Sequence, residues 1–252
     1  MKGTALWVHG DGARGQVPCK GTMQGDSPVT LAGDGSLKEV SSMKIAIIGA
    51  GGVGATLGRA FANRGHKVAF GVRRPDDPAY GPLRALQNTT VTTASDAVSA
   101  SEIAVLAVPG SAAAATVGAL GPLLDGKVLV DATNPIRADF TGLEQGPHPS
   151  AAQSLAALVP SCHVVKAFNT ASTETMADPR YPEGPAVMIV CGDDPASTER
   201  IAALATEIGF EGIAAGPLAL AEQLEQLAWL YIHLALKTGL GRSVAFRIAR
   251  RT

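Results

Sequence analysis

The fold is decided by one stretch of the sequence, Lys44-Ile-Ala-Ile-Ile-Gly49-Ala-Gly51-Gly-Val-Gly54. Its apolar run is typical of a buried parallel strand, and the glycines end that run where a helix over Val53–Asn63 is expected to begin. Gly49 permits the tight turn, Gly51 lets a pyrophosphate approach the backbone, and Gly54 lets helix and strand pack closely. Because the first amides of that helix would face the phosphates at the positive end of its dipole, the stretch predicts a dinucleotide-binding site.

The end of the next expected strand, Lys67–Gly71, indicates which dinucleotide binds. NAD sites place an Asp or Glu there, which hydrogen-bonds the ribose hydroxyls and repels a 2′-phosphate. This chain instead has Arg73 and Arg74, and guanidinium groups stay charged and can bind a phosphate bidentately. We therefore predict NADP as the cofactor. The alternative, that both arginines are solvated loop charges, stays open at this point.

Strands and helices alternate from Met43 onward, which is typical of a parallel sheet covered on both faces. We predict an α/β fold, a Rossmann-type doubly wound and mostly parallel sheet with a small C-terminal helical part. The expected strands are 44–49, 67–71, 90–93, 103–108, 128–131, 163–168, 187–191 and a short one near 212–215. The expected helices are 53–63, 83–87, 95–99, 111–120, 150–158, 195–208 and 218–237.

Three regions are expected along the chain. Residues 1–42 hold eight glycines and no apolar run longer than Ala5–Val8, so we expect a loosely ordered leader and not a secretory signal. We assign residues 43–171 to an NADP-binding Rossmann domain. Residues 172–252 are assigned to a small C-terminal α/β and helical domain.

Composition excludes several classes of protein. The 252 residues are 46% hydrophobic and 17% charged, as in an ordinary globular protein. The net charge of −1 gives no reason to expect nucleic acid or an anionic membrane as a partner. Three widely spaced cysteines form neither a disulfide framework nor a zinc motif, so we expect no metal and predict a cytoplasmic protein. The apolar segments 103–124 and 218–236 are interrupted by Pro and Gly or by polar residues, so we expect no membrane span.

Ligands of open α/β sheets collect beyond the carboxyl ends of the strands. In this sequence those ends carry the glycine loop, the arginine pair, Val108-Pro109, Thr133-Asn134-Pro135 and Asn169. We expect the Val-Pro pair to form an apolar wall beside the cofactor, and the Thr and Asn side chains to orient the nicotinamide ribose or carboxamide. Simple shaping of the loops is the open alternative. The predicted cofactor-binding residues are Gly49, Ala50, Gly51, Gly52, Val53, Gly54, Arg73, Arg74, Val108, Pro109, Thr133, Asn134, Pro135 and Asn169.

A series of motifs runs through residues 43–252. In order, they are Met43-Lys-Ile-Ala-Ile-Ile-Gly-Ala-Gly-Gly-Val-Gly54, Gly71-Val-Arg-Arg74, Asp131-Ala-Thr-Asn-Pro135, Val164-Val-Lys-Ala-Phe-Asn-Thr170, Cys191-Gly-Asp-Asp194 and Ala215-Gly-Pro-Leu218. This combination resembles the coenzyme F420-dependent NADP oxidoreductases, the NADPH:deazaflavin reductases. The first motif is shared by many dinucleotide enzymes, whereas the order and spacing of the whole series are much more specific.

The resemblance implies hydride exchange between NADP(H) and coenzyme F420 or a related flavin, from C4 of the nicotinamide to C5 of the deazaflavin. Because the cofactors carry that chemistry, the protein needs to stack two rings and exclude water. We therefore expect no catalytic acid–base residue. The resemblance also implies a homodimer, and related members that accept flavins include the cytosolic domains of membrane metalloreductases.

Two features leave the hydride partner open. Relatives that use the deazaflavin often have a His in the loop after the sixth strand, where this chain has Phe168-Asn169-Thr170. Near the C-terminus, Arg242 and Arg247 could attract the anionic chain of a deazaflavin, although solvated terminal charge is an equally simple explanation. Lys166 is expected to be structural, at the rim of the sheet, and Asn169 is the better candidate for ligand contact.

We therefore predict an NADP-dependent oxidoreductase that transfers a hydride between NADP(H) and coenzyme F420 or a related flavin. Two alternatives remain. The first is an NADPH-dependent flavin reductase, and the second is a non-catalytic NADPH-binding redox sensor.

Overall fold

The computed structural model describes residues 29–31, 37–39 and 42–251, in two units that are treated separately. The first unit holds an antiparallel pair of short strands, β1 (Val29–Leu31) and β2 (Leu37–Glu39). Most of the leader expected over residues 1–42 lies outside the described residues, so its loose ordering stays a prediction. The second unit runs from Val40 to Thr252 and carries the elements below.

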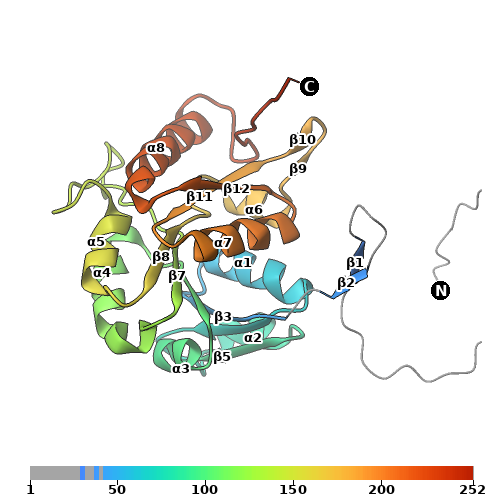
Figure 1. Ribbon diagram of the computed structural model, residues 1–252, viewed down its shortest axis with the longest axis vertical. Helices are drawn as coiled ribbons and strands as arrows, with labels where there is room; N and C mark the ends of the chain where they lie inside the picture. Colours follow the sequence, from blue (N-terminus) through green and yellow to red (C-terminus); the bar gives the residue numbers. More distant parts are fainter. Residues whose placement is uncertain (1–28, 32–36, 40–41, 252) are drawn as a thin grey trace, which may run out of the picture. The chain divides into compact units, whose positions relative to one another are not determined.

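An eight-stranded sheet forms the centre of the second unit (Figure 1). Its strands in chain order are β3 (Lys44–Ile48), β4 (Lys67–Gly71), β5 (Thr89–Thr92), β6 (Ile103–Leu106), β7 (Val128–Asp131), β8 (His163–Lys166), β11 (Val187–Gly192) and β12 (Glu211–Gly216). Across the sheet the order is β12-β11-β8-β7-β6-β3-β4-β5. Neighbouring strands are parallel except β8 and β11, which pair antiparallel. The predicted mostly parallel, doubly wound sheet is confirmed.

Helices cover both faces of this sheet (Figure 1). On one face lie α1 (Gly52–Asn63), α6 (Thr173–Ala177) and α7 (Pro195–Glu207). On the other face lie α3 (Ala94–Ser99), α4 (Gly110–Leu120), α5 (Ala151–Leu158) and the start of α8 (Ala221–Lys237). The smaller elements are η1 (Pro78–Tyr80), α2 (Gly81–Arg84), η2 (Gly121–Leu124), η3 (Leu218–Leu220) and the hairpin of β9 (Arg180–Tyr181) with β10 (Gly184–Pro185).

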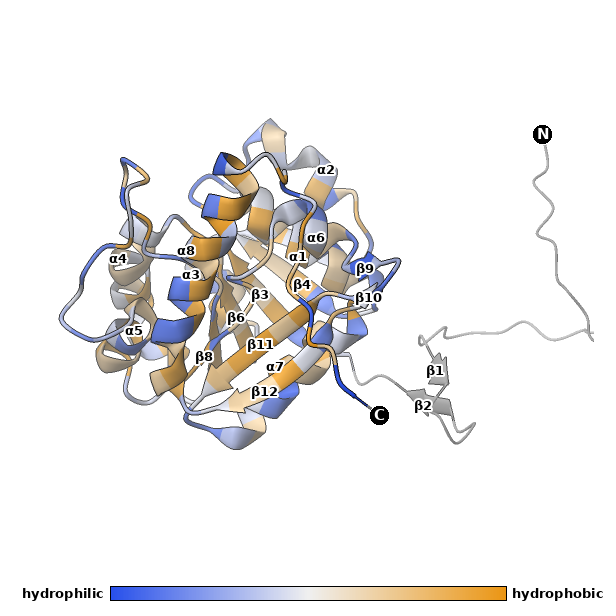
Figure 2. Cartoon of the chain, turned by 90° about the horizontal axis from the view of Figure 1, so that it is seen from above, coloured by the Kyte–Doolittle hydropathy of each residue, from blue (hydrophilic) through white to orange (hydrophobic). Residues whose placement is uncertain are grey.

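The buried strands divide their side chains between two cores. Along β3, Ile45 and Ile47 join the core under α1 and α7, whereas Ala46 and Ile48 join the core under α3, α4 and α5. This alternation follows from the two-residue period of a strand, and both faces are apolar because helices cover both. Figure 2 shows the hydrophobic residues gathered on the central strands, with the hydrophilic ones on the outer sides of the helices.

Helix starts follow the local sequence closely. The Asp194 carboxylate accepts a hydrogen bond from Ser197 N at 2.8 Å, with Pro195 in the first turn of α7. Ser150 caps α5 in the same way, accepting from Gln153 N at 3.0 Å. The expected elements therefore form within a few residues of their predicted bounds. Helix α6 and the β9–β10 hairpin were not predicted, because such short elements carry no clear hydrophobic period.

The sheet continues past the expected domain boundary at residue 171. Cys191 and Gly192 of β11 pair with Lys166 and Val165 of β8, so the C-terminal strands extend the nucleotide-binding sheet. The division into residues 43–171 and 172–252 stays a prediction about how the chain is organised.

Candidate functional site

A cleft opens where the direction of the chain across the sheet reverses. Strands β3 and β6 are neighbours, and the chain runs from β3 toward β5 on one side and from β6 toward β8 on the other. We call the hollow at their carboxyl ends the cofactor cleft; its volume is about 680 Å³. It is lined by Ile48, Gly49, Ala50, Gly51, Gly71, Val72, Arg73, Tyr80, Thr93, Ala94, Ala107, Val108, Pro109, Ala112 and Thr116. The structure thus brings six of the predicted contacts, residues 49–51, 73, 108 and 109, into one hollow.

The glycine loop has the geometry expected for holding a pyrophosphate. Gly49 has φ +96°, and a Cβ there would lie 2.7 Å from the carbonyl oxygen of Ala107. A Cβ on Gly54 would lie 1.9 Å from the carbonyl oxygen of Gly49, so helix and strand touch at this position. At Gly51, in contrast, a Cβ would meet nothing within 4 Å. The backbone there is open to a ligand.

The start of α1 is free to receive that ligand. Gly51 caps the helix, no side chain bonds to the cap, and the first turn contains no acidic residue. The first amides of a helix lack partners within it, and the positive end of the helix dipole favours an anion. The loop and the helix start therefore fit a dinucleotide phosphate group.

The arginine pair follows β4 directly. Arg73 lines both the cofactor cleft and a smaller hollow of about 360 Å³ formed with Arg74 and Tyr80. The Arg74 side chain is 84% exposed and lies 3.2 Å from the Asp77 carboxylate. Arg84 donates hydrogen bonds to the carbonyl oxygens of Pro75 and Asp77 and so fixes the loop. Sequence reasoning missed Tyr80, because a tyrosine nine residues beyond a strand has no fixed position.

Four other predicted contacts, Thr133, Asn134, Pro135 and Asn169, lie outside the cleft lining, beyond the ends of β7 and β8. Asn134 Nδ2 donates to the carbonyl oxygen of Asn169 at 2.8 Å, and Asn169 Nδ2 donates to Asn134 Oδ1 at 3.1 Å. Asn169 Nδ2 also reaches the carbonyl oxygen of Leu224 at 3.0 Å. Asn169 is 4% exposed, and its Oδ1 atom has no hydrogen-bond partner among the described residues. A buried oxygen without a partner is costly, which makes it a candidate acceptor for a ligand.

The backbone of Phe168 orients the Asn169 side chain toward Asn134. Phe168 has φ +61°, the left-handed region that a bulky residue rarely adopts. Its ring is fully buried and packs edge-on against Phe61 and Phe210, at centroid distances of 6.0 and 6.4 Å. Packing therefore holds the strained turn that follows β8.

A buried charge cluster lies beneath the same turns. Lys166 Nζ lies 2.8 Å from Asp131 Oδ2, 2.7 Å from the carbonyl oxygen of Thr133 and 3.0 Å from Glu225 Oε1. Burial alone would lower the pKa of Lys166, but the two carboxylates outweigh it and leave the pKa above its usual value. Lys166 is the last residue of β8, at the expected rim of the sheet, but it is fully buried, which was not predicted. Its partner Glu225 lies far along the chain in an apolar helix, where no sequence spacing indicates the contact.

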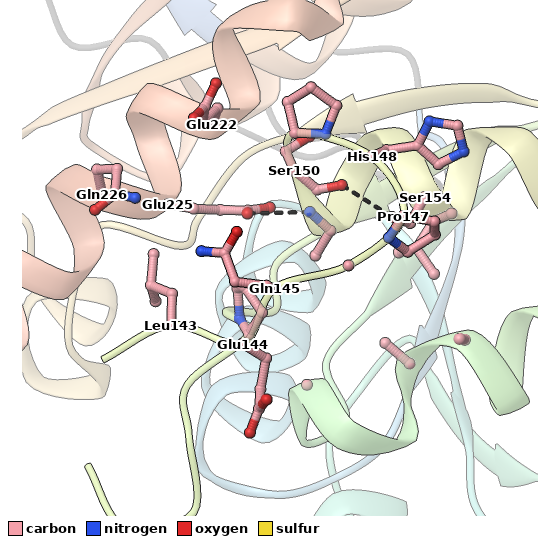
Figure 3. A pocket seen from close by; sticks show the side chains of 18 residues that line it. Leu143, Glu144, Gln145, Pro147, His148, Ser150, Ser154, Glu222, Glu225 and Gln226 are labelled. Carbon is pink, nitrogen blue, oxygen red and sulfur yellow. Dashed lines mark hydrogen bonds between the residues drawn. The ribbon is translucent and has the colours of Figure 1, made fainter. Parts of the chain in front are cut away.

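A second pocket lies beside this cluster (Figure 3). Its volume is about 290 Å³, and α4, α5, α8 and the loop before α5 enclose it. Glu225 points from α8 across this pocket toward the start of α5 and accepts hydrogen bonds from Ala151 N and Ala152 N at 3.1 and 3.2 Å. Among the described residues lining the pocket there are three glutamates, at positions 144, 222 and 225, and no lysine or arginine.

The first turn of α4 separates the two hollows. Pro109, Ala112 and Thr116 face the cofactor cleft, whereas Gly110 and Ala113 line the second pocket. A Cβ on Gly110 would lie 2.2 Å from the carbonyl oxygen of Asn134, so this turn packs directly against the end of β7. Of the predicted contacts in the β7 turn, Pro135 lines the second pocket.

Other reactive groups are absent or blocked in the described part of the chain. No set of three or more His, Cys, Asp and Glu residues within it could hold a metal ion. Burial raises the pKa of the Cys162 thiol and of the Cys191 thiol to about 11 each, so neither is suited to act as a nucleophile. No helix within 42–251 is long and apolar enough to cross a membrane. The tail residue Arg242 pairs with Glu174 at 3.0 Å.

Comparison with known proteins identifies the family. The sequence pattern of the family described as NADP oxidoreductase, coenzyme F420-dependent, matches residues 44–135. A solved structure from Arthrobacter sp. FB24, a provisional F420-dependent NADP reductase, is 30% identical with a TM-score of 0.73; the match covers 83% of this chain and 100% of that one. The chain belongs to the coenzyme F420-dependent NADP oxidoreductase family.

Two curated relatives of this oxidoreductase family member differ in length. The F420-dependent NADP reductase of Methanothermobacter marburgensis is 29% identical over 224 residues, which cover 82% of this chain and 98% of that protein. Metalloreductase STEAP3 of Rattus norvegicus is 34% identical over 197 residues, which cover 77% of this chain and 38% of that protein. This family member thus spans well under half the length of the metalloreductase.

Proposed function

We propose that this family member transfers a hydride between NADP(H) and coenzyme F420 or a related flavin. The observation that carries the proposal is that two hollows border the first turn of α4, one on each side of it. One hollow has the glycine loop and Arg73, which fit a phosphorylated dinucleotide, and the other has room for one ring system. The unpartnered Oδ1 of Asn169 supports a ligand near the same turn.

The chain's own residues would bind and orient the cofactor. The amides at the start of α1 would hold the pyrophosphate, with Gly51 leaving the space for it. Arg73 and Arg74 would hold the 2′-phosphate. Val108 and Pro109 would form the apolar wall, and Asn169 Oδ1 would accept a hydrogen bond from the nicotinamide carboxamide. The predicted cofactor contacts also include Gly52, Val53, Thr133, Asn134 and Pro135.

Hydride transfer makes few demands on side chains. NADPH, when bound, supplies the hydride from its nicotinamide. The protein would keep the rings close and the site dry, and the apolar residues of both hollows suit that task. Because the second pocket is lined by glutamates, the anionic chain of a deazaflavin or FMN would extend outside it. A homodimer and a cytoplasmic location remain proposals that rest on the family and on cysteine usage.

The test is a comparison of hydride acceptors. The protein is incubated with NADPH and, separately, coenzyme F420, FMN or FAD, and the absorbance of both cofactors is followed. We expect NADPH oxidation with at least one acceptor, with F420 as the first choice. Tight NADPH binding without oxidation by any acceptor would instead support a redox sensor.

A further inference from the structure

The Lys166 ammonium group joins three parts of the candidate site. A protonated lysine has three N–H donors and no acceptor. Here they face Asp131 Oδ2, the carbonyl oxygen of Thr133 and Glu225 Oε1, at 2.7–3.0 Å. The amine is fully buried, so its donors are all used inside the protein.

Two of these contacts fix the turn that follows β7. Asp131 Oδ1 accepts hydrogen bonds from Thr133 N at 2.9 Å and from Thr133 Oγ1 at 2.7 Å. Lys166 then closes the turn by binding the other carboxylate oxygen and the Thr133 carbonyl. Asn134, a predicted cofactor contact that is hydrogen-bonded to Asn169, comes next in the chain.

The third contact fixes the wall of the second pocket. Glu225 is 3% exposed and lines that pocket from α8. Besides Lys166, its carboxylate binds the first two amides of α5, Ala151 N and Ala152 N. One ammonium group therefore ties α8 and the start of α5 to the turn after β7.

We propose that Lys166 is a positioning residue. It holds the turn that follows β7 and the α8 wall of the second pocket at a fixed separation. This inference rests on the proposed function, because that separation would set the distance between the two rings. The cluster has two carboxylates for one ammonium, and the start of α5 stabilises the additional negative charge. A buried cluster of this kind tolerates few other arrangements, because each group would lose its partner.

The test compares Lys166→Met and Glu225→Gln with wild type, using amide hydrogen exchange. Lys166→Met should accelerate exchange at least tenfold both at residues 132–134 and at the start of α8, residues 221–228. Glu225→Gln keeps the Lys166–Asp131 pair, so it should accelerate exchange in 221–228 and leave 132–134 within about twofold. It is also the variant to read if Lys166→Met does not fold. Lys67→Met, at the exposed start of β4, is the matched control and should change neither segment.

Kinetics add the functional readout. In both variants kcat should fall at least tenfold, the primary deuterium isotope effect on kcat should rise, and the Kd for NADPH should stay within about threefold. Wild-type exchange at 221–228 in Glu225→Gln, or wild-type kcat in either folded variant, would overturn the inference. If wild type reduces no acceptor, the proposed function fails, and the exchange data alone still decide whether Lys166 positions the two segments.

Discussion

Replacing Arg73 or Arg74, which follow β4, should reduce the preference for NADPH over NADH. The structure indicates how much each arginine contributes. A hydrogen bond to a charged group contributes about 1.5–3 kcal/mol, and 1.4 kcal/mol is a tenfold change in affinity. Arg73 lines the cofactor cleft itself, so Arg73→Ala should weaken NADPH binding roughly 10- to 100-fold. NADH, which lacks the 2′-phosphate, should lose less than about twofold.

Arg74 should contribute less, for two reasons visible in the structure. Its side chain is 84% exposed, and the Asp77 carboxylate at 3.2 Å competes for it. Solvent screening weakens such an exposed charge, so Arg74→Ala should cost only a few-fold in NADPH affinity. Asp77→Asn should raise NADPH affinity by a similar factor, because it frees the guanidinium group.

The assay is a titration of NADPH and NADH by isothermal calorimetry at two salt concentrations. Arg64→Ala is the matched control, since Arg64 is exposed at the C-terminal end of α1, whereas the glycine loop is at the N-terminal end of that helix. The NADPH affinity should weaken with salt in wild type and less so in Arg73→Ala. Equal wild-type affinities for NADPH and NADH, or equal losses for both in Arg73→Ala, would refute the reasoning.

Three further predictions concern the framework of the site. Lys166→Met should lower the free energy of unfolding, measured with urea, by about 3–5 kcal/mol, because it leaves two buried carboxylates unpaired. The control Lys67→Met should change that free energy by less than about 0.5 kcal/mol. Since the pKa of Lys166 is raised in the folded protein, the stability that wild type has over Lys166→Met should be complete below about pH 10.4 and be lost as the pH rises through the raised value. Gly54→Ala should lower the free energy of unfolding by about 1–3 kcal/mol. Gly51→Ala should leave that free energy unchanged and weaken NADPH binding by about tenfold or more. Full NADPH affinity in Gly51→Ala would contradict the inference that the backbone at Gly51 is open to the ligand. At pH 8 only about a thousandth of the Cys162 and Cys191 thiols should be ionised, so peptide mass spectrometry should find both alkylated by iodoacetamide far more slowly than free cysteine.

The local part of the site could be predicted from the sequence because the chain itself makes it. The turn at Gly49 and the close contact at Gly54 depend on residues within one strand–helix unit, and both have the predicted geometry. The parallel pairing of most strands also follows from alternation, because parallel neighbours require helical crossovers, whereas the order of the strands was not predicted.

What the sequence could not show depends on contacts between distant segments. Glu225 meets Lys166 only because α8 packs over the carboxyl end of β8, and Asn169 meets Asn134 only because β7 and β8 are neighbours. A lysine in an apolar strand gives no sign of its partner, so the burial of Lys166 was not predicted. The second pocket was missed for the same reason, since its wall combines α4, α5, α8 and a loop.

The most direct test of the central claim follows the hydride itself. NADPH carrying deuterium at both C4 positions is incubated with the protein and coenzyme F420 in ordinary water, and the reduced deazaflavin is analysed by mass spectrometry. We predict one deuterium on the carbon that receives the hydride, since the two rings exchange it directly. Reduced deazaflavin without deuterium would contradict the account, as would bound NADPH that reduces none of F420, FMN and FAD.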